Sequence, residues 1–186
     1  MIMGFNTVKE HSLMLYTELH RTNVEYYDLW YNHILFTWRW WLIVSLIIFP
    51  WIIWFFVRKK EHTHKLLFAG LFVMLISSYM DVLGVGMNLW SYPVKVLPIM
   101  PEFIPFDICA LPVATMLTIQ FFPKVNPLIK SILFSAFASF IFQPINSWLG
   151  LYNNMAWKNY YSFPIIMVIY LLANHIASSK HFSNIG

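Results

Sequence analysis

The sequence predicts an all-α, polytopic membrane protein, with five transmembrane helices preceded by an N-terminal amphipathic helix. Of its 186 residues, 59% are hydrophobic and only 11% are charged. Soluble chains are about 45–50% apolar and about 25% charged. Apolar runs of about 20 residues, the length that crosses a bilayer, recur along the chain. We therefore divide it into an amphipathic segment, residues 1–35, and a five-helix transmembrane domain, residues 36–180.

The amino-terminal segment is too polar to cross a membrane, and it lacks the short apolar core after a basic start that a cleavable signal needs. Its larger apolar residues recur at helical spacing, and most of its charged residues lie off that face. This pattern predicts a helix that lies in the headgroup region. The residues of the apolar face are Tyr16, Leu19, Tyr27, Trp30 and Ile34.

The first predicted span, Phe36–Val57, ends at the densest positive run of the chain, Arg58-Lys59-Lys60. Basic residues collect in cytoplasmic loops, so this end is predicted to be inside and the amino terminus outside. The later spans are predicted at residues 65–88, 103–122, 128–152 and 160–178.

The remaining basic residues agree with this topology, which leaves the carboxyl terminus in the cytoplasm. We expect a multi-pass protein of the bacterial cell membrane. The predicted inner side holds Arg58, Lys59, Lys60, Lys65, Lys124, Lys130 and Lys180, whereas the outer loops hold Lys95 and Lys158.

The second span carries a small and polar stripe. Ser77, Asp81, Gly84 and Asn88 are spaced i, i+4, i+7 and i+11, so they share one helix face. An ionised carboxylate at the centre of a membrane helix costs roughly 2.5–3.5 kcal/mol. Asp81, toward the outer leaflet, therefore needs partners or a function.

Similar stripes follow on the next two spans. Asp107 lies close to the start of the third span, where the helix dipole favours an anion. On the fourth span the polar face reaches the same outer level through Gln143 and Asn146. Between the spans, the Pro-rich outer loop holds Trp90 and Tyr92, which suit a membrane interface.

Two interpretations of this cluster stay open. It forms a pocket near the outer leaflet, in which Asp81 or Asp107 donates a proton or contacts a ligand. Alternatively it joins the helices, with Asp81 hydrogen-bonded to Asn146 or Gln143. For the pocket, the predicted catalytic residues are Asp81 and Asp107, and the predicted ligand-binding residues are Ser77, Asn88, Trp90, Tyr92, Glu102, Gln143, Asn146, Trp148 and Trp157.

Two resemblances follow from the region between the second and third spans. Asp81, Gly84 and Trp90, followed by a Pro-rich loop and acids, resemble the lycopene cyclase domain, although that family's adjacent acidic pair is replaced by Pro101-Glu102 and Pro105-Phe106-Asp107. That likeness implies cyclisation of isoprenoid ends by acid catalysis. The chain resembles more closely a group of uncharacterised small multipass membrane proteins of spore-forming Gram-positive bacteria, through Tyr92-Pro93, Leu97-Pro98 and Phe106-Asp107.

The first functional hypothesis is a protein that binds, and processes by acid catalysis, a membrane lipid or isoprenoid. The tryptophan faces would stabilise developing positive charge. The alternatives are a non-catalytic membrane subunit or scaffold, assembling as a homo- or hetero-oligomer, and a small proton-coupled carrier. We expect no metal site and no nucleic-acid partner, and no motif in the sequence names a cofactor.

Overall fold

The computed structural model describes residues 4–179, which are almost entirely helical. An all-helical fold is therefore confirmed. A two-residue β-ribbon is the only strand pairing in this described range. The elements are α1 (Phe5–His33), α2 (Trp38–Val57), η1 (Lys60–His62), α3 (Thr63–Gly86), β1 (Trp90–Ser91), η2 (Pro105–Ala110), α4 (Leu111–Phe121), α5 (Pro127–Phe137), η3 (Ala138–Phe142), α6 (Gln143–Trp148), β2 (Asn153–Asn154) and α7 (Asn159–Ser178).

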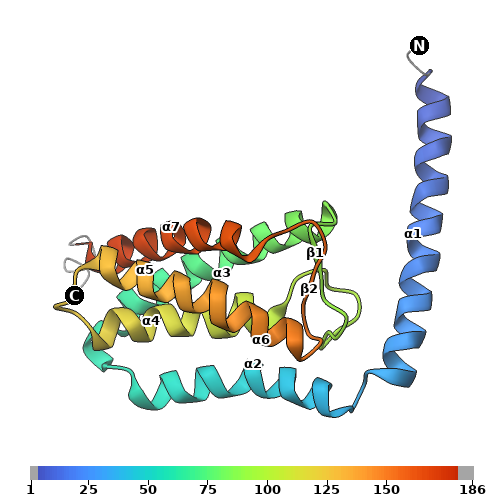
Figure 1. The fold of residues 1–186 in the computed structure, drawn as a ribbon. Helices are drawn as coiled ribbons and strands as arrows, with labels where there is room; N and C mark the ends of the chain where they lie inside the picture. Colours follow the sequence, from blue (N-terminus) through green and yellow to red (C-terminus); the bar gives the residue numbers. More distant parts are fainter. Residues whose placement is uncertain (1–3, 180–186) are drawn as a thin grey trace.

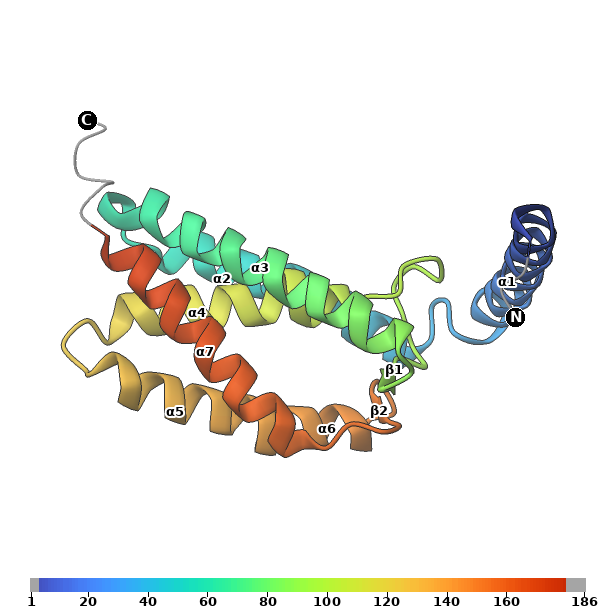
Figure 2. The same ribbon diagram turned by 90° about the horizontal axis from the view of Figure 1, so that it is seen from above.

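From α2 onward the helices form an elongated bundle (Figures 1 and 2). α7 packs against both α3 and α5, α3 also packs against α4, and α2 lies along η2. The loops that contain β1 and β2 close one end of the bundle, while α2, α4 and α7 all end at the other. This arrangement gives the bundle one loop-covered end and one end formed by helix termini.

Four helices in the described range are long and apolar enough to cross a membrane. In the most apolar 18 residues of each helix, at most a third are buried inside the protein. Most of the apolar side chains of these helices therefore face outward. The structure is thus compatible with the predicted multi-pass membrane protein. The four are residues 38–57, 60–86, 127–148 and 159–178.

The predicted third span is the one that falls short. Its helix, Pro105–Phe121, is apolar but has only 17 residues. At 1.5 Å per residue, 17 residues cover about 25 Å, less than the roughly 30 Å of a hydrocarbon core. Its first six residues, η2, form a π-helix, and η3 is a second π-helical turn between α5 and α6. The fifth crossing therefore stays a prediction.

The fourth predicted span ends earlier than expected. It was predicted to reach Tyr152, but α6 ends at Trp148. Gly150 has φ +74°, a left-handed conformation that glycine adopts readily and that breaks the helix. The Arg39 Nε donates to the carbonyl of Leu149 over 2.9 Å and ties this turn to the start of α2.

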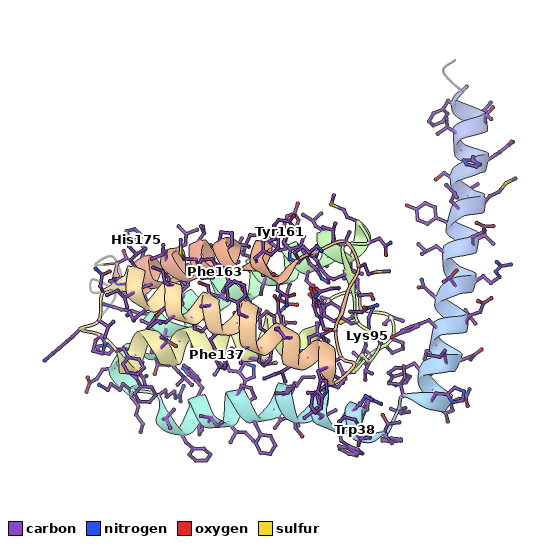
Figure 3. The ribbon with its side chains drawn as sticks, in the orientation of Figure 1. Trp38, Lys95, Phe137, Tyr161, Phe163 and His175 are labelled. Atoms are coloured by element: carbon purple, nitrogen blue, oxygen red, sulfur yellow. The ribbon has the colours of Figure 1, made fainter. Side chains whose placement is uncertain are left out.

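α1 projects from the loop-covered end and runs across the long direction of the bundle (Figures 1 and 2). Only Trp30 of this helix is buried. Its Nε1 donates to the carbonyl of Lys95 over 2.9 Å, and the Tyr26 hydroxyl donates to the carbonyl of Pro93 over 3.3 Å. Lys95 itself lies between α1 and the bundle, with its Nζ 5.6 Å from the centre of the Tyr26 ring (Figure 3).

The interior of the bundle combines small polar and apolar residues. Ser131, Ser135 and Ser139 are fully buried on the α5–η3 helix, beside α7. Small residues let membrane helices approach closely. The predicted polar stripe of this helix thus faces inward, as expected. The predicted inner end of the chain, Lys180 and His181, lies outside the described residues.

Candidate functional site

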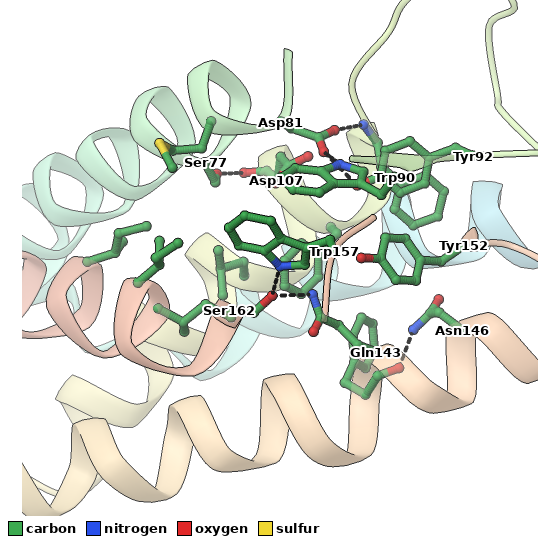
Figure 4. A pocket seen from close by; sticks show the side chains of 18 residues that line it. Ser77, Asp81, Trp90, Tyr92, Asp107, Gln143, Asn146, Tyr152, Trp157 and Ser162 are labelled. Carbon is green, nitrogen blue, oxygen red and sulfur yellow. Dashed lines mark hydrogen bonds between the residues drawn. The ribbon is translucent and has the colours of Figure 1, made fainter. Parts of the chain in front are cut away.

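Asp81 on α3 is the centre of a hydrogen-bond network at the loop-covered end (Figure 4). Its Oδ1 accepts from Trp90 Nε1 and from the Tyr92 hydroxyl, both over 2.6 Å. Its Oδ2 accepts from the backbone N–H of Phe103 over 2.7 Å. Three donors occupy most of the acceptor positions of this buried carboxylate. Asp81 therefore fastens both ends of the loop between α3 and η2.

The local backbone explains why the loop folds onto Asp81. Gly84 lies one turn after Asp81 on the same face, and the Trp90 ring occupies the space that a Cβ at this position would need. Leu89 then accepts hydrogen bonds from the backbone N–H groups of Met155, Ala156 and Trp157. Glycine on α3 thus lets Trp90 reach back to Asp81, while the loops that contain β1 and β2 bind each other.

Asp107 is the second acid of the site and has a different environment. It lies within η2 and is 4% exposed. Its backbone carbonyl accepts from Ser77 Oγ over 3.0 Å, which joins η2 to α3. Its side-chain Oδ2 has no hydrogen-bond partner among residues 4–179. The two predicted acids therefore differ, because Asp81 is fully bonded and Asp107 leaves an oxygen unpaired.

Both acids line one cavity of about 100 Å³, walled mainly by apolar side chains (Figure 4). Phe106 and Phe142 stack across it with their ring centres 5.3 Å apart, and Trp90 meets Trp157 edge to face at 5.1 Å. A dry cavity of about 150 Å³ in another protein holds one benzene molecule. The pocket therefore has room for one small group, not for a whole lipid.

The amide side of the pocket faces α7. Ser162 Oγ accepts from Gln143 Nε2 over 3.0 Å and from Trp157 Nε1 over 2.9 Å, whereas Gln143 Oε1 has no partner among the described residues. Asn146 Nδ2 donates to the carbonyl of Phe142 over 2.8 Å. The predicted hydrogen bond from Asn146 or Gln143 to Asp81 is therefore wrong, because the loop donors already occupy that carboxylate.

Two tyrosines beside the acids lie in the loops outside the helices. Burial raises the pKa of Tyr92 well above its usual range, and the negative charges of Asp81 and Asp107 raise it further. Burial, followed by the charge of Asp81, also raises the pKa of Tyr152. Both hydroxyls are therefore neutral donors over the ordinary pH range.

Three of the predicted binding residues do not line the pocket. Asn88 is exposed with φ +57°, because α3 ends at Gly86 and the chain turns outward. Glu102 is half-buried outside the pocket, one residue before the N–H that binds Asp81. Trp148 is 85% exposed. It lies two residues after Asn146, about 200° around the helix, so it points away.

The other predicted residues come together in the pocket: Ser77, Asp81, Trp90, Tyr92, Asp107, Gln143, Asn146 and Trp157. The prediction missed the rest of the wall, which includes the polar Tyr152 and Ser162 and the apolar residues Met80, Phe103, Phe106, Leu111, Phe142, Ile165, Ile166 and Ile169. Phe106 and Phe142 could have been predicted, because each directly precedes a predicted residue, Asp107 or Gln143. Tyr152 contacts the Tyr92 ring, with the ring centres 5.7 Å apart.

No family model, curated protein or solved structure matches this chain.

Proposed function

We propose that this protein binds one end of a membrane lipid or isoprenoid in the Asp81–Asp107 pocket, and that Asp107 supplies a proton to it. The observation that carries the proposal is the unpaired Oδ2 of Asp107, a buried oxygen facing a cavity walled mainly by apolar groups. A polar atom in such a position has a hydrogen bond or proton to offer a ligand. The small cavity favours a terminal group of the ligand, with the remaining chain in the bilayer.

The aromatic wall supports acid chemistry on a carbon–carbon double bond. The proton passes from the Asp107 carboxyl group to one alkene carbon, which leaves a carbocation at the other. The ring faces of Trp90, Trp157 and Phe106 attract such a cation. Attack by a second double bond of the same molecule closes a ring, and loss of a neighbouring proton to the Asp107 carboxylate restores both the alkene and the acid. This isomerisation needs no redox partner.

The alternative, a non-catalytic subunit whose polar cluster joins helices, is supported by Asp81 itself. Its two oxygens already accept three hydrogen bonds within the chain. We therefore propose that Asp81 is a positioning residue that holds Trp90 and Tyr92 on the pocket wall, and that Asp107 is the proton donor.

For the membrane topology we propose five crossings, with Pro105–Phe121 as the short one, in the bacterial cell membrane. Basic residues favour the α2–α3 end as cytoplasmic, which puts the pocket at the outer leaflet, the amino terminus outside and the carboxyl terminus inside. The direction of α1, across the long direction of the bundle, is compatible with an amphipathic helix in the interface (Figure 1).

The test is native mass spectrometry with lipid extraction on the protein purified from its own membrane in mild detergent. Wild type is compared with Asp107→Asn, and Glu61→Gln serves as the control because it makes the same acid-to-amide change at an exposed side chain on η1 that does not line the pocket. We expect wild type and Glu61→Gln to retain the same small lipid or isoprenoid species. Asp107→Asn should lose it or hold an unconverted isomer of the same mass, separable by chromatography. No retained species in wild type, or identical species in all three proteins, would overturn the proposal.

A further inference from the structure

A second cavity lies at the other end of the bundle, where α2, α3, α4, α5 and α7 end or begin. It encloses about 330 Å³, and its polar lining is basic or neutral. Among residues 4–179 no aspartate or glutamate lines it, and Glu61, the nearest acid in the sequence, is exposed outside it. The polar and charged lining residues are Lys59, His62, Lys65, Gln120, Lys130, Asn174 and Ser178.

Lys130 is the unusual member of this lining. It is only 6% exposed, and its Nζ donates to Asn174 Oδ1 over 3.2 Å. An ammonium group has three N–H donors, and a neutral amide oxygen satisfies one of them without balancing the charge. A buried positive charge without an anion is costly. No carboxylate of the described residues pairs with Lys130, since the one ion pair there is Arg21–Glu25 on α1.

The backbone holds a second lysine toward the same cavity. Gln120 at the end of α4 accepts from the backbone N–H of Lys59 over 2.8 Å and donates to the carbonyl of Val57 over 2.9 Å. This clamp fixes the chain where α2 turns into η1. Lys65 follows on the first turns of α3. Lys59 in the α2–η1 turn, Lys65 on α3 and Lys130 on α5 thus surround one opening.

We propose that this basic cavity binds a phosphate-bearing anion, with Lys59, Lys65 and Lys130 as its cationic contacts. The cavity is large enough for a phosphate group, and its charge is positive without a counter-ion from residues 4–179. Basic pockets between transmembrane helices at a membrane face are a known way to hold lipid headgroups. This site lies at the opposite end from the Asp107 pocket and is independent of the function proposed for it.

The test measures binding to the full chain in mild detergent by calorimetry. The probes are dihexanoyl phosphatidylglycerol, dihexanoyl phosphatidylcholine and inorganic phosphate. The variants are Lys130→Gln and the double variant Lys59→Gln/Lys65→Gln, which keeps the buried lysine in case Lys130→Gln does not fold. The matched control is Lys124→Gln, an exposed lysine at the same end that does not line the cavity.

We expect wild type and Lys124→Gln to bind phosphatidylglycerol more tightly than phosphatidylcholine. Each lining lysine that is removed should weaken binding about fivefold, the equivalent of about 1 kcal/mol per charge near a membrane surface. Tighter binding of phosphatidylglycerol than of inorganic phosphate assigns the cavity to a lipid headgroup, and the reverse order assigns it to a free phosphate. Equal binding by wild type and the lining variants, or an equal loss in Lys124→Gln, would overturn the proposal.

Discussion

The backbone N–H of Phe103 and the Oδ2 of Asp81 lie 2.7 Å apart, which fastens the chain just before η2 to the C-terminal half of α3. The other oxygen of the same carboxylate binds Trp90 and Tyr92 at the beginning of that loop. One side chain therefore determines where the loop leaves α3 and where the next helix starts.

Asp81→Asn is expected to destabilise the protein more than Asp107→Asn does. The asparagine side chain has one oxygen that accepts hydrogen bonds, and its NH₂ group can only donate. The NH₂ group would therefore face either the Phe103 N–H or the Trp90 and Tyr92 donors, and those hydrogen bonds would be lost. Losing a hydrogen bond to a charged group costs about 1.5–3 kcal/mol. At Asp107 the unpaired Oδ2 has no donor to lose. Thermal unfolding in detergent measures both, and equal losses of stability would contradict the different roles of the two acids.

Tyr92→Phe tests one bond of this network. It removes the 2.6 Å hydrogen bond to Asp81 and keeps the ring, which stacks on Phe103 with centres 4.7 Å apart. We expect a loss of about 1.5–3 kcal/mol in the free energy of unfolding. The control is Tyr152→Phe, since Tyr152 contacts the Tyr92 ring without a hydrogen bond to Asp81. A control loss as large as that of Tyr92→Phe would assign the effect to general packing.

The same tyrosine predicts how stability responds to alkaline pH. The pKa of Tyr92 is raised in the folded state, whereas an unfolded tyrosine titrates near pH 10. Stability from this group is present below about pH 10 and is lost as the pH rises further, because only the unfolded state releases its proton. The loss approaches about 1.4 kcal/mol per pH unit. Chemical unfolding between pH 9 and 11 should show a shallower fall for Tyr92→Phe than for wild type or for Tyr31→Phe on exposed α1.

The long helices could be predicted from hydropathy because each needs only a run of apolar residues. The convergence of Asp81, Asp107 and Gln143 could also be predicted, since helical spacing puts each on a buried face at the same end. The exposure of Trp148 follows from the same helical spacing, because it lies two residues after the inward-facing Asn146 and therefore on the opposite side of the helix. Its aromatic character alone therefore does not place Trp148 in the pocket.

The partners of Asp81 could not be predicted in the same way. They come from a loop with three prolines, whose path depends on Gly84, on the Leu89 hydrogen bonds and on the pairing of Trp90 with Asn154. None of these contacts has a periodic signal in the sequence. The π-helical turns in η2 and η3 shift hydrogen bonds by one residue, and hydropathy does not report that shift.

Gly84→Ala is expected to displace Trp90 from Asp81. A Cβ at this position would overlap the Trp90 ring, which is held by the network and cannot move without losing its bond to Asp81. Gly86→Ala is the matched control on the same helix, because a Cβ there meets nothing within 4 Å. Gly84→Ala should lower the unfolding temperature, whereas Gly86→Ala should leave it unchanged or raise it. A similar fall in both variants would mean that the cost lies in the helix and not in the Trp90 contact.

Trp30→Phe is expected to loosen α1 from the bundle without unfolding the bundle itself. The indole N–H of Trp30 donates to the Lys95 carbonyl, and phenylalanine keeps most of the apolar contact while removing that donor. The net loss of one hydrogen bond, about 1 kcal/mol, makes the undocked state about fivefold more populated. Hydrogen–deuterium exchange should therefore quicken in the last turns of α1 and in the loop around Lys95, but not in α5 or α7. Trp148→Phe makes the same change at a side chain 85% exposed and should leave exchange in α1 unchanged. Unaltered exchange in Trp30→Phe would mean that the linker after α1 and the Tyr26 contact suffice to hold the helix.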